Sequence, residues 1–250
     1  MKEDDKILIH VLHCGQVQVD IGTPFKQKTL NPLAFAGIMR SQKYQVVLPV
    51  SAYLIEHPQG LVLVDTGWHT NVREGVEPFI KRNGRIVYKA SKPILPAGQA
   101  INEQLNSLGV KTEDIDYVVI THLDLDHVSG VELVKNAKHI LVSSEEWKSA
   151  NKPILRYNPK LWQNVDCEPF EFKESGIGPE GRSLDIFGDG TIQLVYTPGH
   201  SKGLTSVLVQ HDDKSVLICS DVAYAAKAWR EMILPGMTPE KSKAKKSLQW

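Results

Sequence analysis

The sequence predicts an α/β protein in which two β-sheets pack together and helices lie outside them. Short β-branched runs separated by turn residues recur in both halves of the 250 residues, and segments with helical spacing lie between them. No internal repeat is visible, and no linker rich in Gly, Ser or Pro divides the chain. We therefore expect a single domain over residues 1–250.

The first half of the chain alternates between expected strands and helices. Residues 46–56 and 61–65 are expected to be strands joined as a hairpin across residues 57–60. Residues 99–108 space their apolar side chains by four and three and stop before Gly109, which is typical of an amphipathic helix with a glycine cap. The other expected elements are strands at residues 6–13, 117–121 and 139–142 and short helices at residues 131–134 and 144–150.

The second half repeats this style. Its expected strands are residues 191–195, 204–210 and 215–219, the last two joined by a turn at residues 211–214. Thr238–Glu240 form a cap-plus-proline start for a helix that continues to the end. Residues 66–97 and 151–182 show no clear periodicity, so we expect long loops there. Loops of that length are often functional, for example as lids over a site.

Composition and charge exclude several classes of protein. Hydrophobic residues make up 42% and charged residues 23%, as in an ordinary globular protein. Lys+Arg and Asp+Glu both number 29, which argues against a nucleic-acid partner. The opening residues MKEDDK do not resemble a signal peptide, and Pro49 and Ser51 interrupt the most apolar run, so no membrane partner is expected. Cys14, Cys167 and Cys219 are too widely separated for a CxxC knuckle, and we expect a reduced, cytoplasmic protein.

The most informative segment directly follows the strand expected at residues 117–121. His122, Asp124, Asp126 and His127 place four side chains able to bind a metal within six residues. A loop that leaves a strand end can turn several side chains onto one point, whereas a continued strand would alternate them between faces. Imidazole together with carboxylate suits Zn²⁺, Mn²⁺ or Fe²⁺, while Ca²⁺ prefers oxygen ligands alone. The alternative interpretation is an acidic, solvated loop.

Two distant segments strengthen the metal interpretation. His200 lies in a turn fixed by Pro198 and flanking glycines, and Asp221 follows the apolar run at residues 216–219. Taken alone, His200 would be a turn residue and Asp221 a helix cap. Because each follows an apolar strand, as the first segment does, the three segments together predict a convergent metal site.

In these three segments the sequence resembles the metallo-β-lactamase superfamily, whose signature is HxHxDH followed by a distant His, an Asp and a final His. Within it, the chain is most similar to the N-acyl homoserine lactone lactonases. The resemblance covers nearly the whole length, including residues 63–67, 122–127, 197–203 and 221–224. It implies an αββα sandwich of two mixed β-sheets with helices outside, in a monomer or homodimer.

The resemblance also implies a set of site residues. Two divalent metal ions, zinc first among them, would be held by His122, Asp124 and His200 at the first site, by Asp126 and His127 at the second, and by a bridging Asp221. Tyr224, three residues after that aspartate, would point into the site. Asp65 would orient a ligand histidine from behind.

Two departures from the family pattern affect this expectation. Asp124 stands where the family has histidine, and its harder, anionic carboxylate shifts the preference toward iron or manganese. The family's final ligand is a histidine on a strand beyond the C-terminal helix, whereas no histidine follows His211 here. The second metal would then keep three protein ligands plus solvent. We expect a C-terminally truncated chain that lacks this strand.

The implied reaction is opening of the lactone ring of N-acyl homoserine lactones by a metal-bridging hydroxide, which would quench quorum signalling. Tyr224 would stabilise the charge that develops on the carbonyl oxygen, and Asp126 would carry a proton to the leaving oxygen. One alternative is a glyoxalase-II-like thioesterase or another ester hydrolase of the same fold. A second is a metal-depleted, weakly active or inactive domain.

Several other side chains have less specific interpretations. His69 follows the strand end at residue 65 and is expected to be a structural loop histidine rather than a ligand. Four apolar side chains in or near the irregular segments would line an acyl-chain pocket or belong to the ordinary core. These are Trp68, Phe79, Ile80 and Trp229.

Overall fold

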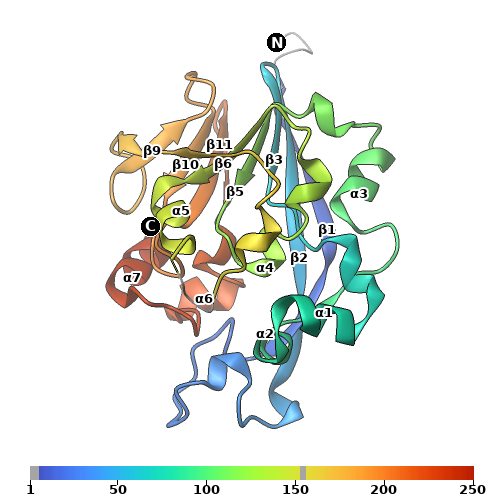
Figure 1. Ribbon diagram of the computed structural model, residues 1–250. Coiled ribbons are helices and arrows are strands. Elements are labelled where there is room, and N and C mark those ends of the chain that lie inside the picture. The colour runs from blue at the N-terminus through green and yellow to red at the C-terminus, as the bar shows by residue number, and fades with distance from the viewer. Residues whose placement is uncertain (1–5, 153–155) are drawn as a thin grey trace.

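The computed structural model describes residues 6–152 and 156–250. Two β-sheets pack against each other, and helices lie outside them (Figure 1). This arrangement confirms the predicted α/β class.

The first sheet has seven strands among the described residues, in the order β4-β1-β2-β3-β5-β6-β7. Their bounds are β1 (Leu8–Asp20), β2 (Gln45–His57), β3 (Gly60–Val64), β4 (Lys92–Ile94), β5 (Tyr117–Ile120), β6 (His139–Ser143) and β7 (Cys167–Phe170). Strands β4, β1, β2 and β3 pair antiparallel, whereas β3, β5, β6 and β7 pair parallel. The carboxyl end of β5 therefore lies beside that of β3, and the motif at residues 122–127 emerges there.

The second sheet follows in the order β12-β11-β10-β9-β8. Its strands are β8 (Lys173–Glu174), β9 (Arg182–Asp185), β10 (Ile192–Tyr196), β11 (Thr205–His211) and β12 (Lys214–Ile218). Two mixed sheets were expected, but every pairing in this one is antiparallel. The reason is that short connections, which suit antiparallel neighbours, join its strands in sequence.

The helices run between and after the strands. They are α1 (Val76–Asn83), α2 (Arg85–Ala90), α3 (Ile101–Ser107), α4 (Leu125–Val128), α5 (Ser144–Ala150), α6 (Ala226–Glu231) and α7 (Lys241–Gln249). Single 3-10 turns are η2 (Ala34–Ala36), η3 (Gln42–Tyr44), η4 (Thr70–Glu74), η5 (Thr112–Asp114), η6 (Val131–Val134), η7 (Pro159–Leu161) and η8 (Ser220–Val222). Helices α1, α2 and α3 lie beside the β1 side of the first sheet, and α6 and α7 lie together near the chain end (Figure 1).

Alternation along the strands builds two cores. On β3, Val62 and Val64 join the cluster shared with the second sheet, whereas Leu63 joins the cluster on the opposite face. Ile101 and Leu105 of α3 complete that outer cluster at 0% and 1% exposure, so the predicted helical spacing reflects packing. Burial of both faces explains why β3 and β5 read as continuous apolar runs.

Strand β1 extends further than predicted. A strand was expected at residues 6–13, but β1 continues to Asp20, with a register shift between His13 and Gln16. Gly15 has φ +94° at this irregularity, and a Cβ there would lie 2.5 Å from the carbonyl oxygen of Ile94. The glycine that interrupts the sequence pattern is therefore required for the close approach of β4.

The prediction of long loops at residues 66–97 and 151–182 was wrong in part. Helices α1 and α2 and strand β4 occupy much of the first segment, and β7 and β8 lie in the second. Val76, Phe79 and Ile80 of α1 do follow helical spacing, but only Phe79 is buried and α2 buries no side chain, so the signal covers little more than one turn. Residues 153–155 lie outside the described residues.

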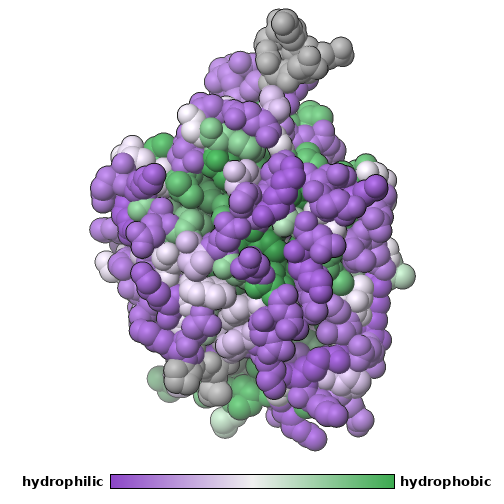
Figure 2. All heavy atoms as spheres, turned by 45° about the horizontal axis from the view of Figure 1, so that its top comes forward, coloured by the Kyte–Doolittle hydropathy of each residue, from purple (hydrophilic) through white to green (hydrophobic). Residues whose placement is uncertain are grey.

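Polar and charged side chains dominate the face shown in Figure 2, with apolar side chains visible in patches among them. No helix within residues 6–152 and 156–250 is both long enough and apolar enough to cross a bilayer. The three cysteines are all free thiols.

Candidate metal centre

The motif at residues 122–127 begins in the turn after β5 and ends in a helical turn. Asp124 keeps extended backbone angles (φ −71°, ψ 152°) and is the residue before α4. Its carbonyl oxygen accepts a hydrogen bond from the backbone N–H of His127 at 3.0 Å. Residues 122–124 leave the sheet while 126 and 127 sit on the first turn of α4, so side chains close in sequence turn to a common region.

Four donor atoms from three segments converge at one point. His122 Nε2 lies 3.4 Å from Asp124 Oδ2 and 3.8 Å from Asp221 Oδ2. His200 Nε2 lies 3.1 Å and 3.4 Å from the same two oxygens. Ligand atoms about 2.0–2.1 Å from a tetrahedral zinc ion lie about 3.3–3.4 Å from one another. His122, His200 and Asp221 each place one ligand atom within 4.8 Å of the other two, which fits a single ion, and Asp124 Oδ2 lies beside the two imidazoles.

The hydrogen bonds of the two imidazoles support this fit. His200 Nδ1 must donate to the carbonyl oxygen of Met237 at 3.0 Å, which leaves the Nε2 lone pair facing the other donors. His122 Nδ1 lies 3.1 Å from Thr121 Oγ1. His122 Nε2 is buried and has no hydrogen-bond partner among the described residues. A buried polar atom without a partner requires an explanation, and a metal ion supplies one.

Asp221 connects the four-donor group with His127. The aspartate lies on η8, just after β12, and follows Ser220, which has φ +48°. Its Oδ2 faces the first two imidazoles, while its Oδ1 lies 3.3 Å from His127 Nε2. The hydroxyl of Tyr224 donates to Asp221 Oδ2 and so lies directly at the donor group.

Asp65 fixes His127 from behind, as predicted. Its Oδ2 lies 2.8 Å from His127 Nδ1 and accepts the Thr121 hydroxyl at 2.8 Å, while its Oδ1 accepts the Thr121 N–H at 2.8 Å. Asp65 itself has φ +59°, a conformation that is uncommon outside glycine. This strained backbone directs one buried carboxylate to both β5 and the motif.

The electrostatics of the cluster are those of closely packed opposite charges. Burial alone would raise the pKa of Asp124, but the Arg156 guanidinium and the neighbouring imidazoles hold it well below its usual value. Burial would lower the pKa of His127, yet Asp65 and Asp221 raise it well above the usual range. In this arrangement a proton on His127 balances carboxylate charge, and a cation at the centre would compete with that proton.

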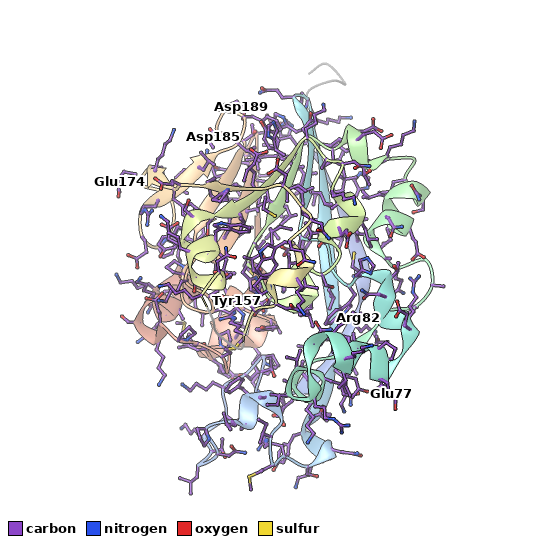
Figure 3. All side chains as sticks on the ribbon, viewed as in Figure 1. Glu77, Arg82, Tyr157, Glu174, Asp185 and Asp189 are labelled. Carbon is purple, nitrogen blue, oxygen red and sulfur yellow. The ribbon has the colours of Figure 1, made fainter. Side chains whose placement is uncertain are left out.

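Glu146 ties together the loops that carry His122 and His200. It is fully buried on α5 and accepts the N–H of Leu123 at 3.1 Å, the N–H of Gly203 at 3.0 Å and the hydroxyl of Tyr157 at 2.9 Å. A Cβ on Gly203 would lie 2.1 Å from the Glu146 nitrogen, so only glycine allows this approach. Tyr157 lies in the interior, far from Asp185 and Asp189 at the other end of the second sheet (Figure 3).

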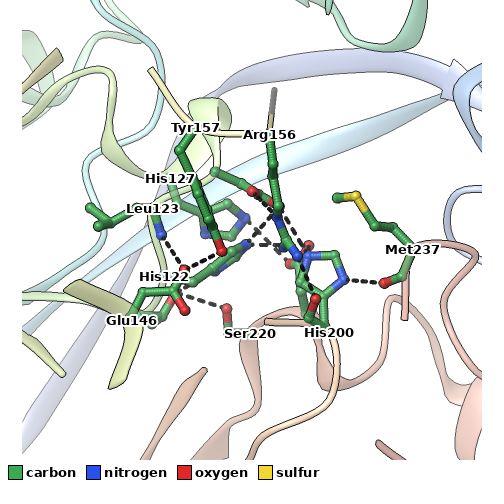
Figure 4. Close-up of polar contacts among 12 residues, drawn as sticks. His122, Leu123, His127, Glu146, Arg156, Tyr157, His200, Ser220 and Met237 are labelled. Atoms are coloured by element: carbon green, nitrogen blue, oxygen red, sulfur yellow. Dashed lines mark hydrogen bonds and ion pairs between the residues drawn. The ribbon is translucent and has the colours of Figure 1, made fainter. Parts of the chain in front are cut away.

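Arg156 lies beside the centre and was missed by the sequence analysis. Its Nε donates to Asp124 Oδ1 at 2.6 Å and its Nη2 to Asp124 Oδ2 at 2.7 Å (Figure 4). Its Nη1 donates to the carbonyl oxygen of His200 at 2.6 Å. The one signal that could have pointed to it is the anionic Asp124 at a histidine position, because an extra buried carboxylate requires a cation nearby.

Two cavities reach the donor group. One, of about 360 Å³, is mostly apolar and is walled by β1, β2, α2 and the segment around η2, with Asp124, Asp126 and Tyr224 at one end. The other, of about 470 Å³, lies between β1, β2 and β12 and also reaches Asp126 and Tyr224. Asp126 thus lines both cavities, although its carboxylate forms no ion pair within 4.0 Å in the described part of the chain.

The four apolar side chains suggested for an acyl-chain pocket line neither cavity. Trp68 and Phe79 are 0% and 2% exposed in the outer core, where they pack edge to face. Trp229 is 49% exposed on α6. These side chains serve packing or the surface, and the apolar wall comes from other elements. His69 accepts the N–H of Asn71 at 3.0 Å through Nδ1, the loop role expected for it.

Of the six predicted ligands, the structure brings His122, His200 and Asp221 into one group, and Asp124 adjoins it through the two imidazoles. His127 adjoins that group through Asp221, and Asp126 lines the same two cavities as Asp221. The donor set fits a divalent metal at the first position, which the residues present would hold with two imidazoles and two carboxylates.

Comparisons with known proteins agree with this arrangement. Residues 46–249 match the model of the metallo-beta-lactamase superfamily. The N-acyl homoserine lactonase AttM of Rhizobium radiobacter is 31% identical over 205 residues, which cover 76% of this chain and 70% of that protein. The N-acyl homoserine lactonase of Bacillus thuringiensis is 28% identical over 199 residues, which cover 77% of this chain and 72% of that protein.

Solved structures show the same fold. An N-acyl homoserine lactone hydrolase, with the product N-hexanoyl-L-homoserine bound at its catalytic metal centre, superposes with a TM-score of 0.76 at 23% identity, covering 96% of this chain and 85% of that one. A probable metal-dependent hydrolase from Staphylococcus aureus gives a TM-score of 0.70 at 19% identity, covering 100% and 84%. The chain therefore belongs to the metallo-β-lactamase superfamily of hydrolases.

Proposed function

We propose that this protein opens the lactone ring of N-acyl homoserine lactones with the help of divalent metal ions, zinc first among them, and so quenches quorum signalling. The observation that carries the proposal is the group of buried donors at the end of an apolar cavity, with the Tyr224 hydroxyl directly on it. Relatives at 28–31% identity that are named N-acyl homoserine lactonases support the choice of substrate. We propose the cytoplasm as its compartment because its three thiols are free.

The residues proposed for the metals follow the family pattern. His122, Asp124 and His200 would hold the first ion, Asp126 and His127 the second, and Asp221 would contact both. Bound there, divalent ions would polarise a carbonyl group and lower the pKa of a coordinated water. Asp124 makes iron or manganese plausible competitors of zinc, because a carboxylate is a harder ligand than imidazole.

Two side chains would act on the lactone itself. Tyr224 would donate its hydroxyl to the carbonyl oxygen as negative charge develops there, exchanging its present bond to Asp221 for one that is stronger in the transition state. Asp126 lines the same cavities and would pass a proton to the ring oxygen as the C–O bond breaks. Water adds across that bond, and the product is an N-acyl homoserine.

The apolar cavity would take the acyl chain. Its wall of β1, β2 and α2 side chains begins at Asp124 and Tyr224, so an amide-linked acyl group can extend into it while the lactone remains at the donors. Val17 and Leu48 line both cavities and separate the two directions of approach. A volume of about 360 Å³ suits a small apolar ligand.

The experiment is a ring-opening assay on zinc-loaded protein. N-hexanoyl homoserine lactone is the substrate, its N-acyl homoserine product is quantified by liquid chromatography and mass spectrometry, and a glutathione thioester is assayed in parallel. Asp221→Asn should lose at least about 100-fold in rate. Glu174→Gln, an exposed carboxylate on β8, is the matched control and should keep the rate (Figure 3).

Other outcomes would reject the proposal in different ways. Turnover of the thioester without the lactone would favour a glyoxalase-II-like thioesterase. Zinc-loaded protein that turns over neither would favour a weakly active or inactive domain.

A further inference from the structure

We propose that Arg156 is a positioning residue that allows Asp124 to replace a histidine as a metal ligand. In this interpretation the guanidinium cancels the added negative charge and holds one carboxylate oxygen toward His122, His200 and Asp221. The inference rests on the metal site of the proposed function, but it does not depend on which substrate that site hydrolyses.

The geometry of the pair leaves one oxygen available to a metal. Arg156 contacts Asp124 through two parallel hydrogen bonds, Nε to Oδ1 at 2.6 Å and Nη2 to Oδ2 at 2.7 Å. Two carboxylate oxygens offer about four lone pairs, so this pairing leaves acceptor capacity on Oδ2. That same Oδ2 lies 3.1 Å from His200 Nε2 and 3.4 Å from His122 Nε2. The two parallel hydrogen bonds therefore hold Asp124 Oδ2 toward the imidazoles of His122 and His200.

The charges of the metal-free centre favour such a partner. Asp221, Asp126 and Asp65 already bring three carboxylates to a largely buried region. A fourth in place of a neutral imidazole would be costly unless it were paired. Arg156 and Asp124 are each 13% exposed and together carry no net charge, which is the charge that a histidine would contribute.

Arg156 is also held from the far side. Its third nitrogen bonds the carbonyl oxygen of His200 at 2.6 Å, so it contacts a second ligand loop. The next residue, Tyr157, donates to buried Glu146, which also accepts the N–H of Leu123. Figure 4 shows Leu123 and Tyr157 bonded to Glu146 on one side, with Arg156 beside His200. The arginine is thus attached to both loops that carry the first-site imidazoles.

The test is a double-mutant cycle that measures the affinity for Zn²⁺ by competition with a chromophoric chelator. The variants are Asp124→His, Arg156→Gln and the double substitution. In Asp124→His an unpaired guanidinium would face the imidazoles and repel the ion, and we expect affinity to fall at least about tenfold. In that background, removing Arg156 should relieve the repulsion and restore zinc binding.

The deciding quantity is the effect of Arg156→Gln in the two backgrounds. The ratio of the zinc affinity after Arg156→Gln to the affinity before it should be at least about tenfold larger with histidine at position 124 than with aspartate. The reason is that only aspartate pairs with the arginine. A smaller difference between these two ratios, or a larger gain in zinc affinity with aspartate at position 124, would overturn the proposal. Arg156 would then compete with the metal for Asp124 or be a purely structural residue. A wild-type chain that binds no zinc would overturn it as well.

Two further variants separate positioning from folding. Arg156→Lys keeps the charge but loses the two parallel hydrogen bonds, so zinc should still bind and be released to the chelator several-fold faster. Arg182→Gln removes the arginine that pairs with Glu145 at 2.7 Å and should leave zinc release unchanged. Thermal unfolding of the metal-free proteins identifies any variant that fails to fold. Because no lactone is used, this cycle can succeed or fail independently of the ring-opening assay.

Discussion

Substitution of Glu146 by glutamine tests whether the two ligand loops are held by one buried carboxylate. Oε1 accepts two donors, Leu123 N–H and Tyr157 hydroxyl, whereas Oε2 accepts Gly203 N–H. Glutamine can keep its oxygen toward the first pair, but its NH₂ group then faces the N–H of Gly203. One hydrogen bond to a charged group is lost, and one buried donor is left unsatisfied.

The expected cost follows from these two changes. A hydrogen bond to a charged group contributes about 1.5–3 kcal/mol, and an unsatisfied buried donor costs about 1–3 kcal/mol. Because the two effects overlap, we expect the free energy of unfolding to fall by about 2–4 kcal/mol. For a chain of this length, each kcal/mol lowers the melting temperature by about 2–4 °C. We therefore expect Glu146→Gln to melt roughly 4–16 °C below the wild type.

The assay is thermal and urea unfolding of the metal-free protein, followed by circular dichroism. Glu145→Gln is the matched control. Glu145 precedes Glu146 in the same helix, its side chain is 28% exposed, and it forms an ion pair with Arg182. The free energy of unfolding of Glu145→Gln should fall by no more than about 1 kcal/mol. If both variants unfolded at the same midpoint, Glu146 would not hold the two ligand loops together.

Three other substitutions test separate parts of the structure. Asp65→Asn tolerates the positive φ but places an N–H against His127 Nδ1, which forces that proton to Nε2; zinc affinity should fall at least about tenfold, and an unchanged affinity would refute the orienting role. Tyr224→Phe should lower the ring-opening rate by about 100-fold while keeping the zinc content, and a wild-type rate would exclude the tyrosine from the reaction. The hydrogen bonds from Arg73 lower the pKa of Glu103 from 4.5 to about 2, so the pair stabilises the fold above pH 4.5 and loses its effect as the pH falls through 2. Glu103→Gln should therefore be about 1 kcal/mol less stable than wild type at pH 7, with the difference in urea midpoints vanishing near pH 2; a gap that persists there would contradict the assignment.

The parts of the fold that could be predicted are those whose sequence signal is local. Strands such as β3 and β5 are buried on both faces, so their apolar runs are continuous and unambiguous. Helix α3 displays its period because Ile101 and Leu105 both face the core. Helices α1 and α2 contribute a single buried side chain between them, so their apolar spacing is too short to separate them clearly from a loop.

The candidate site divides in the same way. Its donors follow strand ends, where residue type and spacing are visible in the sequence, and the role of Asp65 could be assigned from the family resemblance. Arg156 could not be found, because it lies 32 residues from Asp124 in a segment without periodicity. The role of Glu146 could not be predicted either, because a glutamate near the start of a helix normally faces solvent. Both are defined by contacts that only the folded chain creates.

Anomalous diffraction at the zinc absorption edge shows whether buried donors from three segments hold a metal ion. Crystals of the zinc-loaded protein should show a peak about 2.0–2.2 Å from His122 Nε2, His200 Nε2 and one oxygen each of Asp124 and Asp221. The Asp124–Arg156 pair should remain intact beside it. Zinc-loaded crystals without a peak at that point, or with the Arg156 guanidinium in its place, would show that these donors do not hold a metal ion.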